Sequence, residues 1–343
     1  MKHKTFFWFI LPTLSAMLLF IALPIVSVAI QSLYIEHEQV LVVTENCGPF
    51  GCTEATAVDL EATASLREEQ PLGRFNGLDT YTNRAHLAFA EIGESWNTTE
   101  TWSAFFSEVL DLPFYWALAF TLTYTFVVTP FVLVLGLAIA VAVNNLPKMF
   151  KGPTIFVSLL PMIVTPLVGA LILFWMVDGD GIIGATLQWI TGDPTLSLKA
   201  TTSLNWVMLI VYGIWSSLPF AFIVFYAGLQ TVPSETMEAA MIDGASKWQS
   251  MRHVVVPHLM PLVIFISLIQ LMDNFRVFEP IISFQAEAHA RSLSWIIYND
   301  LIEAGNPLYG SAGASSILTI IGVAFLLVPV LIRTWRDFNS KPV

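Results

Sequence analysis

Long apolar runs, separated by short polar turns, dominate the hydropathy pattern of this chain. Six runs approach or exceed the length of a membrane span, at residues 6–33, 116–143, 154–177, 206–229, 254–278 and 315–332. A spanning helix needs roughly 20 apolar residues, and the first run also exceeds the roughly 7–15 apolar residues of a signal peptide. The pattern predicts an all-α integral membrane protein with six transmembrane helices, the first of them uncleaved.

Composition agrees with a membrane protein and also locates the charge. The chain is 55% hydrophobic and 12% charged, with a mean hydropathy of +0.69, whereas soluble domains carry about 25% charged residues. Residues 35–113 hold 14 acidic and 3 basic residues, which accounts for the whole net charge of −11. The acidity therefore belongs to one polar insert. It does not indicate a basic partner, and we expect no nucleic-acid ligand.

The polar insert at 35–113 is long enough to fold as a small unit. It contains Cys47 and Cys52, which flank a Gly-Pro-Phe-Gly turn. Outside the cytoplasm such a pair can form a local disulfide; the alternative is two free thiols. A metal site is not expected, since no further ligands cluster nearby.

A polar loop at 231–257 lies between the fourth and fifth runs. Ser234 follows Pro233 and is a candidate N-cap, and Asp243-Gly244 is a candidate turn. Ser246 and Gln249 form a capping-box pattern for a second helix. The sequence thus predicts a helix–turn–helix close to the membrane, which suits a docking surface better than a pore.

Several residues of this loop resemble a known family. Glu238-Ala239-Ala240, Gly244 and the later Pro257 are similar to the EAA loop of permease subunits of ATP-binding-cassette importers. Asp243, Ala245 and the preceding Ala-Gly-Leu-Gln at 227–230 resemble the carbohydrate-uptake branch, which is maltose- or glycerol-phosphate-like. The resemblance implies a type I importer permease fold in which this loop is a coupling helix that enters a cleft on a cytoplasmic ATPase subunit.

The resemblance also implies roles for single residues. Ala239 and Ala240 keep one helix face narrow, Gly244 permits the chain reversal, and Glu238 is a candidate for a charge-assisted bond. Trp248 is expected to contact the ATPase, or alternatively to pack against the chain's own helices. The expected coupling residues are therefore Glu238, Ala239, Ala240, Asp243, Gly244, Ala245, Trp248 and Pro257.

Basic residues predict the orientation. With the N-terminus inside, the short cytoplasmic segments collect nine of the fifteen lysines and arginines, as the positive-inside rule requires. We therefore expect both termini in the cytoplasm of a bacterium, the insert in the periplasm and the loop facing the ATPase. The regions are then 1–34 (tip and first span), 35–113 (periplasmic insert), 114–335 (permease core) and 336–343 (cytoplasmic tail).

Polar and aromatic residues within the spans are candidates for a solute path, because polar groups are costly to bury in lipid. These candidates are Gln270, Asp273 and Asn274 in the fifth run and Tyr212 and Trp215 in the fourth. The alternative for Asp273 is an ion pair with Arg276, three residues later. A sugar, polyol or glycoside is the expected solute. The sequence Ser-Phe-Gln-Ala-Glu at 283–287 departs from the pattern frequent in carbohydrate permeases.

No energy-converting or catalytic motif occurs in the chain. It lacks a G-x-x-x-x-G-K-[ST] phosphate loop, H-E-x-x-H and G-x-S-x-G. We expect no enzyme activity and no bound cofactor, with ATP and Mg²⁺ held by a separate ATPase dimer. A second permease subunit, of a different sequence, and a periplasmic solute-binding protein are the other expected partners. Alternatives are an ion-coupled secondary transporter or an importer permease for a non-sugar solute.

Overall fold

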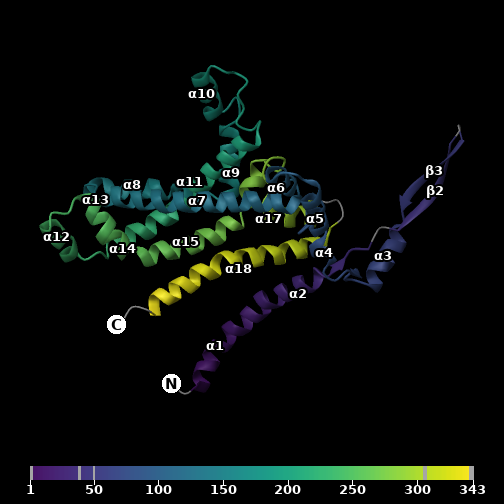
Figure 1. Ribbon diagram of the computed structural model, residues 1–343, viewed down its shortest axis with the longest axis horizontal. Coiled ribbons are helices and arrows are strands. Elements are labelled where there is room, and N and C mark those ends of the chain that lie inside the picture. Colours follow the sequence, from purple (N-terminus) through teal and green to yellow (C-terminus); the bar gives the residue numbers. More distant parts are fainter. Residues whose placement is uncertain (1–2, 38–39, 49–50, 304–306, 340–343) are drawn as a thin grey trace. The chain divides into compact units, whose positions relative to one another are not determined.

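The computed structural model describes residues 3–37, 40–48, 51–303 and 307–339, and helices account for most of them (Figure 1). The chain divides into two compact units. The first holds Met1–Trp116 and Ile296–Ile320, and the second holds Ala117–Trp295 and Ile321–Val343.

The first unit contains the N-terminal helices and the polar insert. Its elements are α1 (His3–Met17), the π-helical turn η1 (Leu18–Ala22), α2 (Leu23–Gln31), β1 (Tyr34–Ile35), β2 (Leu41–Gly48), β3 (Gly51–Val58), α3 (Leu60–Glu69), β4 (Arg74–Phe75), α4 (Asp79–Thr82), α5 (Phe89–Thr98) and α6 (Trp102–Leu110). The second segment of this unit, Ile296–Ile320, contains the π-helical turn η3 (Asn299–Glu303) and the start of α18 (Tyr309–Asn339). The first apolar run is confirmed as a helical stretch, Phe6–Gln31, long and apolar enough to cross a membrane.

The described part of the insert contains two small antiparallel sheets and four helices. β1 pairs with β4, and β2 pairs with β3 as a hairpin in which Cys47 is opposite Cys52. The side chains of both cysteines lie outside the described residues, so the disulfide stays a prediction. The backbone register is the one that such a bond would need, because facing residues in an antiparallel pair have close Cβ atoms.

Polar contacts hold the insert to the helices that flank it. The Ser32 and Tyr81 hydroxyls are 2.6 Å apart, and Glu36 accepts a hydrogen bond from the backbone N–H of Gly310 (2.7 Å). His86 is fully buried, with Nε2 at 3.1 Å from the carbonyl oxygen of Ser311. Burial lowers the pKa of His86, while the Ser311 carbonyl acts in the opposite direction. These contacts are long-range, so no local sequence pattern indicated them.

The second unit contains most of the remaining helices. In order they are α7 (Pro113–Asn144, which begins in the first unit), α8 (Lys148–Ile163), α9 (Pro166–Met176), α10 (Ile182–Thr191), α11 (Thr202–Leu229), α12 (Ser234–Ile242), α13 (Lys247–Ser250), the π-helical turn η2 (Met251–Val255), α14 (Val256–His258), α15 (Met260–Phe275), α16 (Glu279–Ser283) and α17 (Leu293–Tyr298, which ends in the first unit).

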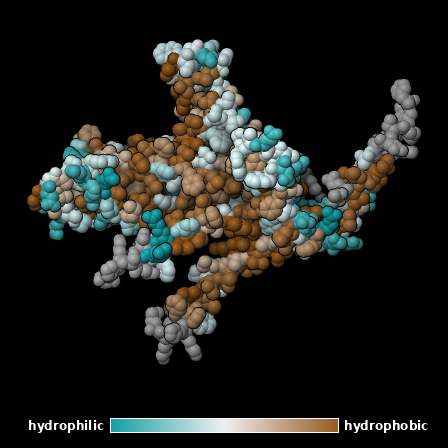
Figure 2. Space-filling view, in the orientation of Figure 1, coloured by the Kyte–Doolittle hydropathy of each residue, from teal (hydrophilic) through white to brown (hydrophobic). Residues whose placement is uncertain are grey.

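Burial in this unit differs from that of a soluble protein. Phe120, Phe222 and Phe225 are fully buried, yet Phe126 and Phe131 on α7 are exposed. Figure 2 shows hydrophobic residues over much of the helical surface in this view. An outer surface rich in large apolar side chains is suited to lipid, because lipid tails are as apolar as these residues.

Among the described residues, four helical stretches are individually long and apolar enough to cross a membrane, and two bent helix pairs each meet the same test together. The straight candidates are Phe6–Gln31, Pro113–Asn144, Thr202–Leu229 and Tyr309–Arg336. Counting each bent pair as one span gives up to six, and the exact number of spans stays a prediction.

A proline lies at each bend. The third run bends by 96° between α8 and α9, where Pro166 keeps Thr165 extended. The fifth run bends by 68° between Lys247–His258 and Met260–Phe275. There Pro261 lacks the N–H that would bond to the carbonyl of Pro257. The predicted fifth helix, residues 254–278, is therefore interrupted near Leu259, and its straight part is α15.

Candidate functional site

The predicted helix–turn–helix is present, and Gly244 forms its turn. Gly244 has φ +75° at the end of α12. Its N–H bonds to the carbonyl of Met241 (3.1 Å), and the N–H of Ala245 bonds to the carbonyl of Ala240 (2.9 Å). This pair of bonds is a Schellman motif, which favours glycine at the residue with positive φ.

The two helix starts differ in how well they were predicted. Ser234 is the first helical residue and Pro233 takes the N-cap position without a side-chain bond, so the prediction of Ser234 as N-cap is wrong. The capping box of α13 is confirmed. Ser246 N–H donates to Gln249 Oε1 (2.7 Å), and Gln249 N–H donates to Ser246 Oγ (3.3 Å).

Two contacts hold the base of this loop. Gln230 Nε2 donates to Asn144 Oδ1 (3.0 Å), which joins the C-terminal ends of α11 and α7. Thr231 Oγ1 lies 3.1 Å from His258 Nε2, which joins the residues just before α12 to those at the end of α14. The loop is therefore held at both ends, and its helices project from a supported base.

Large apolar side chains are exposed on the two helices. Met241, Ile242 and Trp248 have exposed fractions of 63%, 86% and 72%. With the exposed Glu238 they form what we call the α12–α13 face. Sequence reasoning missed Met241 and Ile242, although two large apolar residues in a polar helix were the available signal. Four of the other motif residues are exposed, namely Ala239, Asp243, Gly244 and Pro257. The remaining two, Ala240 and Ala245, are half-buried.

Two of the five candidate solute-path residues lie together in the interior. Gln270 and Asn274 are one helical turn apart on α15 and are both buried. Asn274 Nδ2 donates to Gln270 Oε1 (3.3 Å) and to Thr129 Oγ1 of α7 (3.2 Å). Thr129 was not singled out from the sequence, because nothing local relates it to α15.

The other three candidates lie in different surroundings. Asp273 is exposed and pairs with Arg276 at 3.1 Å, which is the alternative considered for it. Tyr212 is buried on α11, and its hydroxyl donates to the carbonyl of Pro166 (2.6 Å) at the bend between α8 and α9. Trp215 is partly exposed and has its ring 6.0 Å from that of Tyr212.

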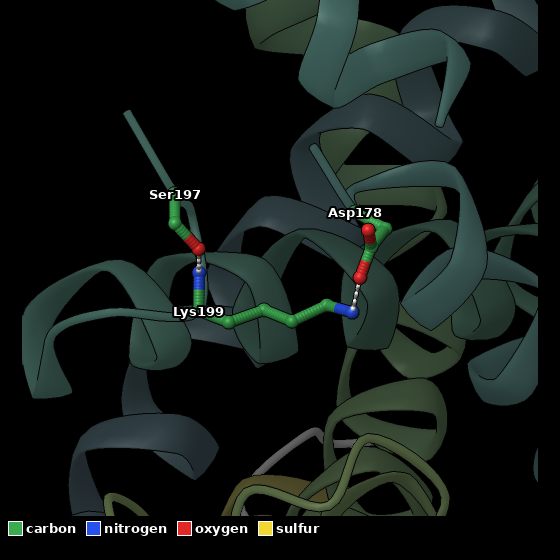
Figure 3. A network of polar contacts seen from close by, with 3 residues as sticks. All are labelled: Asp178, Ser197 and Lys199. Atoms are coloured by element: carbon green, nitrogen blue, oxygen red, sulfur yellow. Dashed lines mark hydrogen bonds and ion pairs between the residues drawn. The ribbon is translucent and has the colours of Figure 1, made fainter. Parts of the chain in front are cut away.

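A further polar cluster follows α9. Lys199 Nζ pairs with the Asp178 carboxylate at 2.7 Å, and the Lys199 backbone N–H donates to Ser197 Oγ (Figure 3). The Lys199 ammonium lowers the pKa of Asp178 and also lies 3.3 Å from the ring centre of Phe174. This network joins the end of α9 to the segment before α11. Within the described ranges, no three potential ligand side chains are grouped closely enough to hold a metal ion.

Comparison with known proteins gives consistent results. Residues 100–337 match the family described as binding-protein-dependent transport system inner membrane component. The chain is 30% identical over 240 residues to a probable ABC transporter permease protein, YesP, of Bacillus subtilis, covering 66% of this chain and 75% of that protein. It is 28% identical over 219 residues to the trehalose transport system permease protein SugA of Mycobacterium tuberculosis, covering 62% and 69%.

The fold also resembles a solved transporter. A crystal structure of a bacterial ABC transporter involved in the import of the acidic polysaccharide alginate superposes with a TM-score of 0.68 at 18% identity, over 99% of this chain and 97% of that one. The family match covers well over half of the chain and includes all of α7 to α17. The chain belongs to the family of inner-membrane components of binding-protein-dependent transport systems.

Proposed function

We propose that this chain is the permease subunit of an ATP-driven importer that moves a sugar, polyol or glycoside delivered by a periplasmic binding protein. The α12–α13 face is the observation that carries the coupling role. It presents Glu238, Ile242 and Trp248 to solvent, on a loop held at both ends. Exposed large side chains on a fixed polar loop are suited to a protein cleft.

Coupling then depends on contact between this face and an ATPase dimer. The ATPase binds ATP and Mg²⁺ and closes when ATP is bound. Since α14 leads into α15 at the 68° bend, movement of α12 and α13 is passed to a helix that carries Gln270 and Asn274. Alternating access requires such a link between the docking face and the residues on the path. A second permease subunit, of different sequence, completes the enclosure of the path.

Orientation is part of this proposal. Six spans with both termini in the cytoplasm place the α12–α13 face on the ATPase side and residues 35–113 in the periplasm. The short-loop lysines and arginines support that arrangement. The same reasoning assigns 1–34 to the tip and first span, 114–335 to the permease core and 336–343 to the cytoplasmic tail.

The solute class is supported by relatives named for transport of trehalose, of trehalose and maltose, and of multiple sugars. In this chain the buried amides of Gln270 and Asn274 offer donors and acceptors of the kind that bind hydroxyl groups.

Uptake by the reconstituted transporter tests this function. Proteoliposomes that contain this chain, the candidate ATPase, the second permease and the binding protein should accumulate a radiolabelled sugar, polyol or glycoside only with ATP inside and binding protein outside. Dissipating the proton and sodium gradients should leave the rate unchanged. Accumulation that follows an ion gradient without ATP would contradict an importer of this class.

Asn274→Leu should weaken solute transport by about three- to tenfold, because a lost hydrogen bond costs roughly 0.5–1.5 kcal/mol. The measurement is the KM and rate of uptake at constant transporter density. Thr129→Val is the matched control, since it removes the hydroxyl that accepts from Asn274 but leaves the amide in place. Equal losses in both variants would assign Asn274 a structural role and remove it from the path.

A further inference from the structure

Four aromatic side chains gather along one edge of the hairpin formed by α5 and α6. The ring of Trp96 lies 5.3 Å from that of Trp102 and 5.4 Å from that of Phe105, and Trp102 stacks on Phe106 at 6.2 Å. Three of these side chains are exposed, at 58% for Trp96, 66% for Trp102 and 57% for Phe106. We call Trp96, Trp102, Phe105 and Phe106 the aromatic edge.

The hairpin is strongly two-sided. On α6, Trp102, Phe105 and Phe106 recur at i, i+3 and i+4, and Val109 and Leu110 continue the same stripe. Three of the hairpin's four charged residues, Glu91, Glu94 and Glu108, line a hollow of about 340 Å³ together with Arg84 and Asp111. The fourth, Glu100, lies in the turn between the two helices. One side of the hairpin is therefore aromatic and uncharged, while the other is acidic and suited to water.

The hairpin is attached to the beginning of a candidate span. Only Asp111 and Leu112 separate α6 from α7, and Asp111 is the last charged residue before the 32 uncharged residues of α7. At a rise of about 1.5 Å per helical residue, Phe106 is roughly 10 Å along the chain from Pro113. The hydroxyl of Tyr115 donates to the carbonyl of Leu87 (2.9 Å), just before α5. Both helices of the hairpin are thus tied to the first turn of α7 (Figure 1).

We propose that the aromatic edge lies in the lipid interface where α7 enters the bilayer, so that α5 and α6 anchor the insert to the membrane surface. Tryptophan is enriched at this depth because its ring is apolar and its N–H remains hydrogen-bonded. Only a few residues of the chain separate the uncharged edge from the start of the apolar helix α7. The acidic side of the hairpin faces water, so binding does not need anionic lipids. The inference depends on α7 being a span and is independent of the transported solute.

Spin labels at two positions of the same hairpin test the proposal. The variants are Phe106→Cys on the edge and Glu94→Cys on the acidic side, each with Cys47→Ser and Cys52→Ser, in the assembled transporter in phosphatidylcholine nanodiscs. The label at 106 should be relaxed more by oxygen than by a water-soluble nickel chelate, and the label at 94 should show the reverse. Equal nickel accessibility at both positions would overturn the proposal.

Tryptophan fluorescence provides a second test that keeps all cysteines and the apolar character of the edge. The emission of Trp96 and Trp102 is obtained by subtracting the spectrum of the double variant Trp96→Phe/Trp102→Phe from that of the wild type. This emission should be quenched by brominated phosphatidylcholine and not by iodide. Quenching by iodide alone would overturn the lipid assignment. Shielding from iodide that occurs only when binding protein is added would identify the aromatic edge as a protein-docking surface. That result would also overturn the lipid assignment.

Discussion

Gly244→Asp should abolish ATP-driven uptake while leaving this chain in the membrane. A residue other than glycine at φ +75° is strained, at a cost of order 1–3 kcal/mol. The new carboxylate would also lie at the C-terminus of α12, where the helix dipole disfavours negative charge. A Cβ at this position meets nothing within 4 Å, so the chain itself has room for it. The damage is therefore expected at the Schellman turn and at the contact with the ATPase.

Co-purification of the ATPase with this chain, and ATP hydrolysis stimulated by loaded binding protein, measure the effect. Gly244→Asp and Glu238→Lys should lose the ATPase or uncouple hydrolysis from uptake. Gly244→Asn should keep much more activity, because asparagine and aspartate make the same demand on the backbone at positive φ and only aspartate adds a negative charge at the end of α12. Gly152→Asp is a matched control, at an exposed glycine with an ordinary φ and no atoms near its Cβ position, and should behave as wild type. Normal coupling in Gly244→Asp would make a gradient-driven transporter the leading interpretation.

Gly136→Val should prevent the second unit from folding stably. A Cβ at Gly136 would lie 2.8 Å from the Cβ of Ala221 and 3.3 Å from the backbone of Ala221 and Phe222. Backbone atoms cannot move aside as the end of a flexible side chain can. Small residues allow membrane helices to approach closely, and overpacking typically costs about 1–3 kcal/mol. We expect a lower melting temperature in detergent and less monodisperse protein on size exclusion.

A compensating substitution identifies the cause. Gly136→Ala should be destabilising by itself, and Ala221→Gly in the same chain should restore much of the melting temperature, because it removes the nearest atom. Gly152→Ala, with open space around its Cβ position, should be neutral. If Ala221→Gly lowers the stability of Gly136→Ala further, α7 and α11 do not meet closely at this point.

Features that depend on near neighbours in the chain were predictable. The capping box joins Ser246 and Gln249, three residues apart, and the Schellman bonds at Gly244 span at most five residues. The alternative of an Asp273–Arg276 pair was also foreseen from their spacing. Ser234 is the exception among the local predictions. Pro233, with its fixed φ, supplies the extended residue before the helix, so Ser234 enters the first turn.

The bends were only partly predictable. Pro166 and Pro261 are visible in the sequence, but a proline within an apolar run is compatible with a straight helix, a kink or a break. Pro130 and Pro219 lie inside α7 and α11 without interrupting them. What distinguishes the bend between α8 and α9 is its surroundings, including the Tyr212 hydroxyl bonded to the Pro166 carbonyl from a separate helix.

The sequence by itself determined insertion into a membrane, the approximate spans and the two-helix loop. These features depend on the length of apolar runs and on hydrogen bonds between residues a few positions apart. Only the tertiary structure decided that Asn274 is buried against Thr129, 145 residues away, while the adjacent Asp273 is exposed. It likewise decided that Ile242 and Trp248 are exposed. The physical reason is that burial depends on which distant segments pack against each helix face, and no local pattern contains that information.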